Sequence, residues 1–115
     1  MSYQLEDIIR DHFLDDIEMF LDIAEGFIDE YPCLLEGIDK AIEESAPKKI
    51  TLSVHKLRGA VSSFRVKKIN SLMSFLEESS HLGADLAFLR KYSELKVNID
   101  SLIEKIRSMT SKKSA

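Results

Sequence analysis

Apolar side chains recur three and four residues apart along nearly the whole chain, a spacing that is typical of amphipathic helices. Only four glycines and two prolines interrupt the 115 residues. The pattern predicts a short helix over residues 4–13. It then predicts four longer helices that begin near Asp15, Pro47, Val66 and Asp85.

The first long helix is predicted from its start signal and from a continuous apolar stripe. Asp15 and Glu18 have the spacing of a capping box. The stripe keeps its phase across Pro32, so we expect one helix kinked at the proline rather than two helices joined by a loop. Pro47 suits the first turn of the next helix, and Gly83 suits a C-terminal cap. The predicted stripe consists of Ile17, Leu21, Ala24, Ile28, Tyr31, Leu35, Ile38 and Ile42.

Short connections between successive helices favour antiparallel neighbours. The sequence therefore predicts an all-α fold, an antiparallel up-and-down four-helix bundle with a short extra N-terminal helix. A chain of 115 residues fits one hydrophobic core, so we assign residues 1–110 to a single domain. Residues 111–115 are polar, and we expect them to form a flexible tail.

The composition is that of a soluble globular chain, with 44% hydrophobic and 31% charged residues and a net charge of −4. The single cysteine, Cys33, excludes an intramolecular disulfide. One cysteine and three scattered histidines give no metal quartet, so we expect neither a metal nor another cofactor. No apolar run approaches the roughly 18 residues of a membrane span, and the N-terminus lacks a signal-peptide core. We therefore expect a cytoplasmic protein that does not bind membranes.

Charge is distributed unevenly along the chain. No acidic residue lies between Ser45 and Leu76, whereas seven basic residues do. Such a strip is either a solvated surface or a surface that holds a phosphoryl group and attracts an acidic partner. The acidic total and the lack of aromatic residues among the basic ones argue against nucleic-acid binding. The basic residues are Lys48, Lys49, Lys56, Arg58, Arg65, Lys67 and Lys68.

His55 lies one residue off the apolar stripe of the helix predicted from Pro47. Residues three and four positions on lie beside it on a helix, so Arg58 is placed to contact charge that is added to the imidazole. Gly59 costs about 1 kcal/mol relative to alanine in a helix. We interpret the glycine as space through which another protein's active site approaches His55. A lone exposed histidine usually has no function, and these two neighbours are what favour one here.

The segment HKLRGAVSSF, residues 55–64, resembles the H-x-L-K-G signature of histidine phosphotransfer (HPt) domains. These domains relay phosphoryl groups between receiver-domain aspartates in multistep two-component signalling. The resemblance covers nearly the whole chain, with a long helix before the motif, a helix containing LEE after it, and a closing helix. It implies that His55 is the phosphoacceptor and that Gly59 provides access. Arg58 stands where the family usually has lysine, which keeps the charge but changes its geometry.

The resemblance also implies a partner surface around the motif. We place Lys56, Ser62 and Arg65 on this surface together with Gly59. Arg65 occupies a position where many HPt domains have a second glycine, near the end of the helix that carries the histidine. This departure leaves the local helix end and the choice of partner open.

Glu77 is predicted to contact the His55 ring. In an antiparallel hairpin that turns near Arg65, His55 lies ten residues before the turn and Glu77 twelve after it, at similar heights. A nucleophilic imidazole presents one unprotonated nitrogen, and the group that accepts from the other nitrogen fixes the tautomer. We expect Glu77 within about 3.2 Å of the ring, or one water away. Phosphotransfer domains of chemotaxis kinases have a carboxylate at the same separation.

The resemblance implies a phosphotransfer intermediate. A neutral nitrogen of His55 takes the phosphoryl group from one receiver aspartate and delivers it to a second. The expected partners are response-regulator receiver domains and an upstream (hybrid) histidine kinase, and we expect a monomer. The chain has no Walker-type glycine loop, so we expect no autokinase activity. The alternative is an adaptor that binds receivers without accepting phosphate, and phosphorylation of His55 distinguishes the two.

Overall fold

The computed structural model describes the backbone of residues 5–114 and the side chains of residues 5 and 7–109. The described residues form helices and connecting turns without a strand, as predicted. The elements are α1 (Leu5–His12), α2 (Ile17–Glu43), α3 (Pro47–Val61), the 3₁₀ turn η1 (Ser62–Phe64), α4 (Lys67–Ser79), the 3₁₀ turn η2 (Ser80–Leu82) and α5 (Leu86–Ser114).

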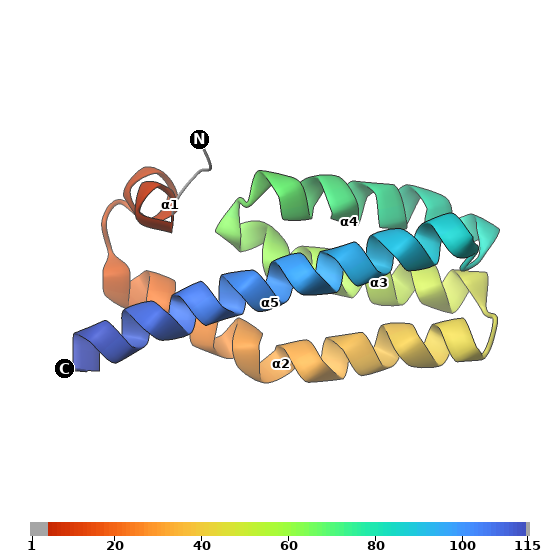
Figure 1. Ribbon diagram of the computed structural model, residues 1–115, viewed down its shortest axis with the longest axis horizontal. Coiled ribbons are helices and arrows are strands. Elements are labelled where there is room, and N and C mark those ends of the chain that lie inside the picture. The colour runs from red at the N-terminus through yellow and green to blue at the C-terminus, as the bar shows by residue number, and fades with distance from the viewer. Residues whose placement is uncertain (1–4, 115) are drawn as a thin grey trace.

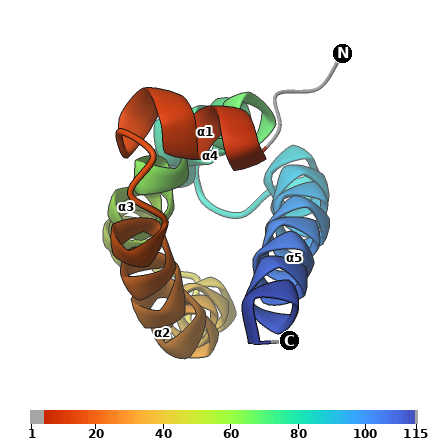
Figure 2. The same cartoon turned by 90° about the vertical axis from the view of Figure 1, so that its left-hand side faces the viewer.

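Helices α2 to α5 form a bundle in which each successive helix reverses direction (Figure 1). Figure 2 looks along the bundle from one end and shows the four helices arranged around a shared interior, with α1 across that end. The apolar side of α1 belongs to the same core, because Ile8 and Ile9 are buried. The predicted antiparallel four-helix bundle with a short N-terminal helix is therefore confirmed.

The start of α2 lies one residue later than predicted. The Asp16 carboxylate accepts a hydrogen bond from the backbone N–H of Met19 at 2.9 Å, so Asp16 is the N-cap. Asp15 lies in the preceding turn with a φ of 64°. Asp15 and Asp16 have the same side chain, and either carboxylate could accept a hydrogen bond from a backbone N–H of the first turn. This explains why the predicted N-cap was one residue too early.

The core-facing stripe of α2 also differs in part from the prediction. Ala24, Tyr31 and Ile38 are buried as expected. At three positions the buried residue is the one before the predicted residue, which is itself half-buried. Leu35 is half-buried, and Ile17, at the start of the helix, is exposed. Apolar residues stand at both adjacent positions, so the sequence permits either phase and the packing selects one. The buried residues concerned are Phe20, Phe27 and Ala41, in place of Leu21, Ile28 and Ile42.

Pro32 lies inside α2, which continues through it as predicted. Figure 1 shows that the first part of α2 runs obliquely to the part that follows. Proline has no N–H to donate, and its ring crowds the carbonyl four residues earlier, which accounts for a bend in a continuous helix.

Helix α3 agrees closely with its predicted stripe. Pro47 occupies the first turn, and the buried residues follow the predicted spacing. The ring of Phe64 packs edge-on against Phe20 and Phe27, with centroids 5.8 and 5.3 Å apart, which ties the end of α3 to α2. This packing fixes which face of α3 points outward. The buried residues are Ile50, Val54, Leu57, Val61 and Phe64.

The backbone of α5 is helical through Ser114, within the segment 111–115 that we expected to be a flexible tail. Ala115 lies outside the described residues, and the flexibility of the segment stays a prediction. No described helix combines the length and the apolar character that crossing a membrane requires.

The chain turns from α3 to α4 at Arg65, which adopts a left-handed conformation with φ 54° and ψ 33°. The backbone N–H of Arg65 donates to the Ser62 carbonyl at 3.1 Å and closes the turn. A side chain at this backbone conformation is unfavourable by about 1–2 kcal/mol, whereas glycine adopts it freely. A glycine would therefore suit this position on conformational grounds, and arginine adopts the same turn at a cost in free energy.

Replacing Arg65 with glycine should stabilise the protein by about 1 kcal/mol, because it removes the strain of the left-handed side chain. Thermal unfolding should report this as a midpoint about 4 °C higher. The matched control is Arg90→Gly, at an exposed position inside α5, which should destabilise the protein by about 1 kcal/mol. Equal losses of stability in both variants would contradict the strain at Arg65.

Candidate functional site

His55 projects from the solvent side of α3. Its neighbours Val54 and Leu57 are completely buried, and the helical rotation between them turns residue 55 outward. The His55 side chain is 70% exposed. The bundle therefore holds the backbone of this residue rigidly while leaving its ring accessible to another protein.

The His55 ring contacts α4 through Glu77. The Nδ1 atom of His55 lies 3.2 Å from Oε1 of Glu77. The predicted contact is therefore present at the predicted distance, and the hairpin of α3 and α4 brings the two residues to the same height. The Glu77 side chain is 26% exposed, so this carboxylate is more enclosed than the ring that it contacts.

Arg58 binds the other oxygen of the same carboxylate. Its Nη1 donates to Oε2 of Glu77 at 2.5 Å, and its Nη2 donates to Oγ of Ser74 at 3.4 Å. Glu77 is a partner of Arg58 that the sequence analysis did not assign, and a contact between Arg58 and charge added to the imidazole stays a prediction. One carboxylate therefore holds both side chains, with the imidazole at Oε1 and the guanidinium at Oε2.

These contacts determine the chemistry of the imidazole. The Arg58 hydrogen bond, followed by the one from His55, lowers the pKa of Glu77 despite the opposing effect of burial. An ionised carboxylate has no proton to donate, so the proton in the contact belongs to Nδ1 of His55. The Nε2 atom makes no hydrogen bond with any described residue. The arrangement presents Nε2 to the outside with a free lone pair.

Gly59 leaves open space beside His55. A Cβ atom added at Gly59 would meet no atom within 4 Å, so packing inside the bundle does not require a glycine here. The described residues therefore leave room for a side chain at this position. This agrees with our interpretation of Gly59 as an access residue, whose role stays a prediction.

The other three predicted surface residues lie apart from the His55–Glu77 contact. Lys56 is exposed on the side of α3 that faces α2, where it lines a groove with Gly37. Ser62 donates to the Gly59 carbonyl at 3.3 Å at the end of α3. Arg65 is exposed at the turn beyond it. The structure therefore spreads these residues around the site rather than gathering them at the ring.

The strip without acidic residues in the sequence has acidic neighbours in space. Lys49 forms an ion pair with Glu44 at 3.1 Å, and Lys68 pairs with Glu94 of α5 at 2.9 Å. Carboxylates from the adjoining segments therefore reduce the positive charge that the sequence alone suggested for this surface.

Sequence reasoning missed the hydroxyl groups that support Glu77. Ser74 binds Arg58, and Ser80 donates to the Glu77 carbonyl at 2.8 Å. The Oγ atoms of Ser80 and Thr51 lie 2.7 Å apart, which connects this end of α4 to α3. Ser74 and Ser80 stand three residues before and after Glu77, and this helical spacing was the signal that could have identified them.

The described residues contain no group of three or more histidine, cysteine, aspartate or glutamate side chains that could hold a metal ion. The polar groups at His55 are instead an exposed imidazole, a carboxylate that contacts its Nδ1, and a neighbouring guanidinium. This combination suits the transfer of an anionic group onto the ring.

Comparison with protein families agrees with this chemistry. The family model described as the Hpt domain matches residues 22–108, which span α3 and α4, most of α2, and α5 as far as Ser108. Neither the search of curated proteins nor the search of solved structures gave a match. Because the family model covers most of the chain, the chain belongs to the Hpt domain family, whose members act in phosphotransfer during two-component signalling.

Proposed function

We propose that this protein relays a phosphoryl group between receiver-domain aspartates, with His55 as the phosphoacceptor. The observation that carries the proposal is the contact between Nδ1 of His55 and Glu77, in a side chain whose outer nitrogen is exposed. Membership of the Hpt domain family supports it. We also infer that the protein acts as a monomer in the cytoplasm and receives the phosphoryl group through a histidine kinase pathway.

The lone pair of Nε2 attacks the phosphorus atom of an aspartyl phosphate on the first receiver. An N–P bond forms, the bond between phosphorus and the aspartyl oxygen breaks, and the aspartate leaves as a carboxylate. The ring becomes positively charged because Nδ1 keeps its proton, and Glu77 stabilises that charge. Transfer to the second receiver reverses these steps on a new aspartate.

The proposal is tested by incubating the protein with a receiver that carries labelled phosphate. We expect label on this protein that is labile in acid and stable in base, followed by loss of the label when an unphosphorylated receiver is added. Binding of the receiver without any transfer of label would overturn the relay and establish the adaptor alternative.

Replacing Gly59 with leucine should slow transfer about tenfold or more, because the added side chain occupies the approach to His55. The variant should fold and be slightly more stable, since a helical glycine is replaced and no atom obstructs the new Cβ. Single-turnover transfer and thermal unfolding measure the two effects.

Two variants serve as controls for this prediction. Gly59→Ala adds only a methyl group and should transfer at nearly the normal rate. Gly26→Leu places the same side chain in open space on α2 and should leave transfer unchanged. Undiminished transfer by Gly59→Leu would remove the access role from this residue.

Replacing Arg58 with alanine should slow transfer about tenfold while weakening receiver binding less. The guanidinium orients the Glu77 carboxylate, which also contacts the imidazole, and from this position it compensates charge on the arriving phosphoryl group. Single-turnover rates at saturating receiver, compared with the dissociation constant, separate the two effects. Arg58→Lys should recover much of the rate, and a loss confined to binding would make Arg58 a docking residue only.

A further inference from the structure

A groove separates the first part of α2 from the second half of α5, away from the His55 site. It has a volume of about 590 Å³. Helices α2 and α5 pack less closely against each other than α2 packs against α3 or α4 against α5. Pro32, the proline inside α2, lies in the wall of the groove. The size is in the range of pockets that bind small molecules.

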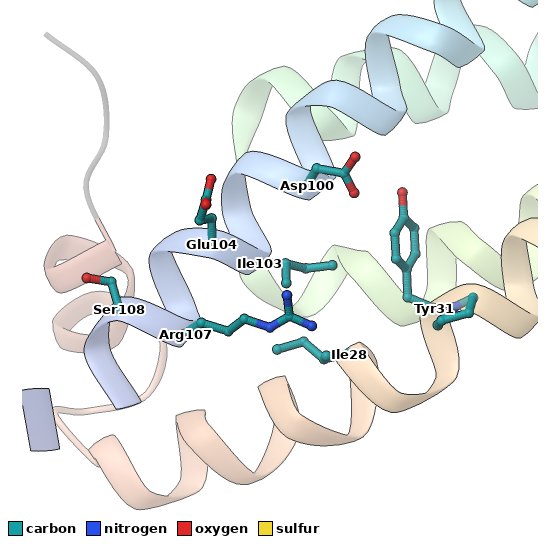
Figure 3. A pocket seen from close by; sticks show the side chains of 8 residues that line it. Ile28, Tyr31, Asp100, Ile103, Glu104, Arg107 and Ser108 are labelled. Atoms are coloured by element: carbon teal, nitrogen blue, oxygen red, sulfur yellow. The ribbon is translucent and has the colours of Figure 1, made fainter. Parts of the chain in front are cut away.

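The groove contains a buried polar group without a partner. Tyr31 is only 6% exposed, and its hydroxyl oxygen has no hydrogen-bond partner among the described residues. Figure 3 shows the phenol rising from α2 towards Asp100 on α5. Burial, together with the carboxylates of Asp100 and Asp39, raises the pKa of Tyr31, so the phenol is neutral at physiological pH. A buried hydroxyl left unpaired is unfavourable, and a ligand donor or acceptor would satisfy it.

Charges of opposite sign stand at the two ends of this groove. Asp100 lies beside the Tyr31 hydroxyl, whereas the Arg107 guanidinium extends between Ile103 and Ile28 (Figure 3). Neither charged group forms an ion pair with another described residue. Asp100 and Arg107 are separated by two turns of α5, or about 10 Å of rise along the axis. Two aliphatic side chains, Ile28 and Ile103, lie between these charges. Glu104 also lines the groove, and its carboxylate points away from both the Tyr31 phenol and the Arg107 guanidinium (Figure 3).

From this arrangement we propose that the groove binds a small aliphatic zwitterion. An ammonium group donates to Asp100 and to the Tyr31 oxygen, since it has three N–H donors and no acceptor. A carboxylate at the other end accepts from the Arg107 guanidinium, which presents its donors in a fork. The methylene chain between them packs on Ile28 and Ile103. This binding site lies outside the phosphotransfer machinery and does not depend on His55.

The test uses the full chain labelled with ¹⁵N and titrated with 6-aminohexanoate as the probe. Saturable amide shifts are expected around Tyr31 in α2 and around Asp100 and Arg107 in α5. Hexylamine and hexanoate each satisfy only one end of the groove and should bind about tenfold more weakly or worse. The variant His55→Gln should bind the probe like the unmodified protein, so failure of the phosphotransfer proposal would not affect this result.

Substitutions assign the shifts to individual groups. Asp100→Asn and Arg107→Gln should each weaken binding about tenfold, and Tyr31→Phe about threefold to tenfold. The matched substitutions Asp22→Asn and Arg90→Gln, on exposed positions outside the groove, should have no effect.

The variant Tyr31→Phe gives a second, independent measurement. Without the probe it should be at least as stable as the unmodified protein, because it removes an unpaired buried hydroxyl. Absence of saturable shifts at about 10 mM probe, equal binding of the one-ended compounds, or destabilisation by Tyr31→Phe would each overturn the proposal.

Discussion

Replacing His55 with glutamine is expected to abolish phosphoryl acceptance completely while leaving the helical content and the unfolding midpoint nearly unchanged. The His55 side chain is 70% exposed and does not belong to the core, so its removal costs little packing. Glutamine is polar and helix-compatible, but its amide nitrogen has no lone pair available to attack phosphorus. The rate of phosphoryl transfer to this variant should therefore be no higher than the background rate measured without the protein.

The measurement is the transfer of label from a phosphorylated receiver, with circular dichroism to check folding. His81→Gln is the matched control, because His81 is also an exposed histidine, in the turn η2 after α4. It should accept label normally. Label that persists on His55→Gln with the acid lability of phosphohistidine would exclude His55 as the acceptor, and loss of label from His81→Gln would point to His81 instead.

The geometry around His55 was largely predictable from sequence because it depends on regular helices. Two amphipathic helices joined by a short turn have few possible registers, and the buried stripe of α3 fixes which way residue 55 points. The position of Glu77 followed from that register. The predicted separation of about 3.2 Å and the observed one agree for this reason.

Three features depended on tertiary packing and were not predictable in the same way. The phase of α2 was ambiguous because apolar residues stand in adjacent pairs, such as Phe27 and Ile28, and tertiary packing, including the contact of Phe27 with Phe64, selects the first of them. The partner of Arg58 was uncertain because a long side chain reaches several groups. The groove at Tyr31 is lined by residues of both α2 and α5. No local sequence pattern relates residues of two helices that are so distant in sequence.

Replacing Glu77 with alanine should slow phosphorylation of His55 about tenfold to a hundredfold without unfolding the bundle. In the proposed mechanism the carboxylate holds the proton on Nδ1 and leaves Nε2 as the nucleophile, and it stabilises the positive ring that forms during attack. Without it, the imidazole exchanges between tautomers and rotates more freely, so fewer encounters with the receiver are productive. Single-turnover transfer measures the rate, and ¹⁵N chemical shifts of the His55 ring report the tautomer.

The variant Glu77→Gln separates the two contributions of this residue. Its amide oxygen still accepts from Nδ1, so the tautomer should be retained, whereas the charge is lost. We expect a rate between those of the unmodified protein and Glu77→Ala. Glu78→Ala, one residue further on and exposed, is the matched control and should transfer normally. If Glu77→Ala changed neither the tautomer of His55 nor the transfer rate, the Glu77 carboxylate would have no role in transfer beyond its contact with Arg58.

The same carboxylate gives the protein a pH-dependent contribution to stability. Its pKa is lower in the folded protein than in the unfolded chain, mainly because of Arg58 and then His55. Folding is therefore favoured by this group above the unfolded value of about 4.3, and the contribution is lost as the pH falls towards the folded value. Glu77→Gln lacks an ionisable group here, so its stability relative to the unmodified protein should rise as the solution is acidified below about pH 4.5. Denaturant unfolding at several pH values checks this. A constant difference between the two proteins across that range would show that the Arg58 and His55 contacts do not lower the pKa of Glu77 in solution.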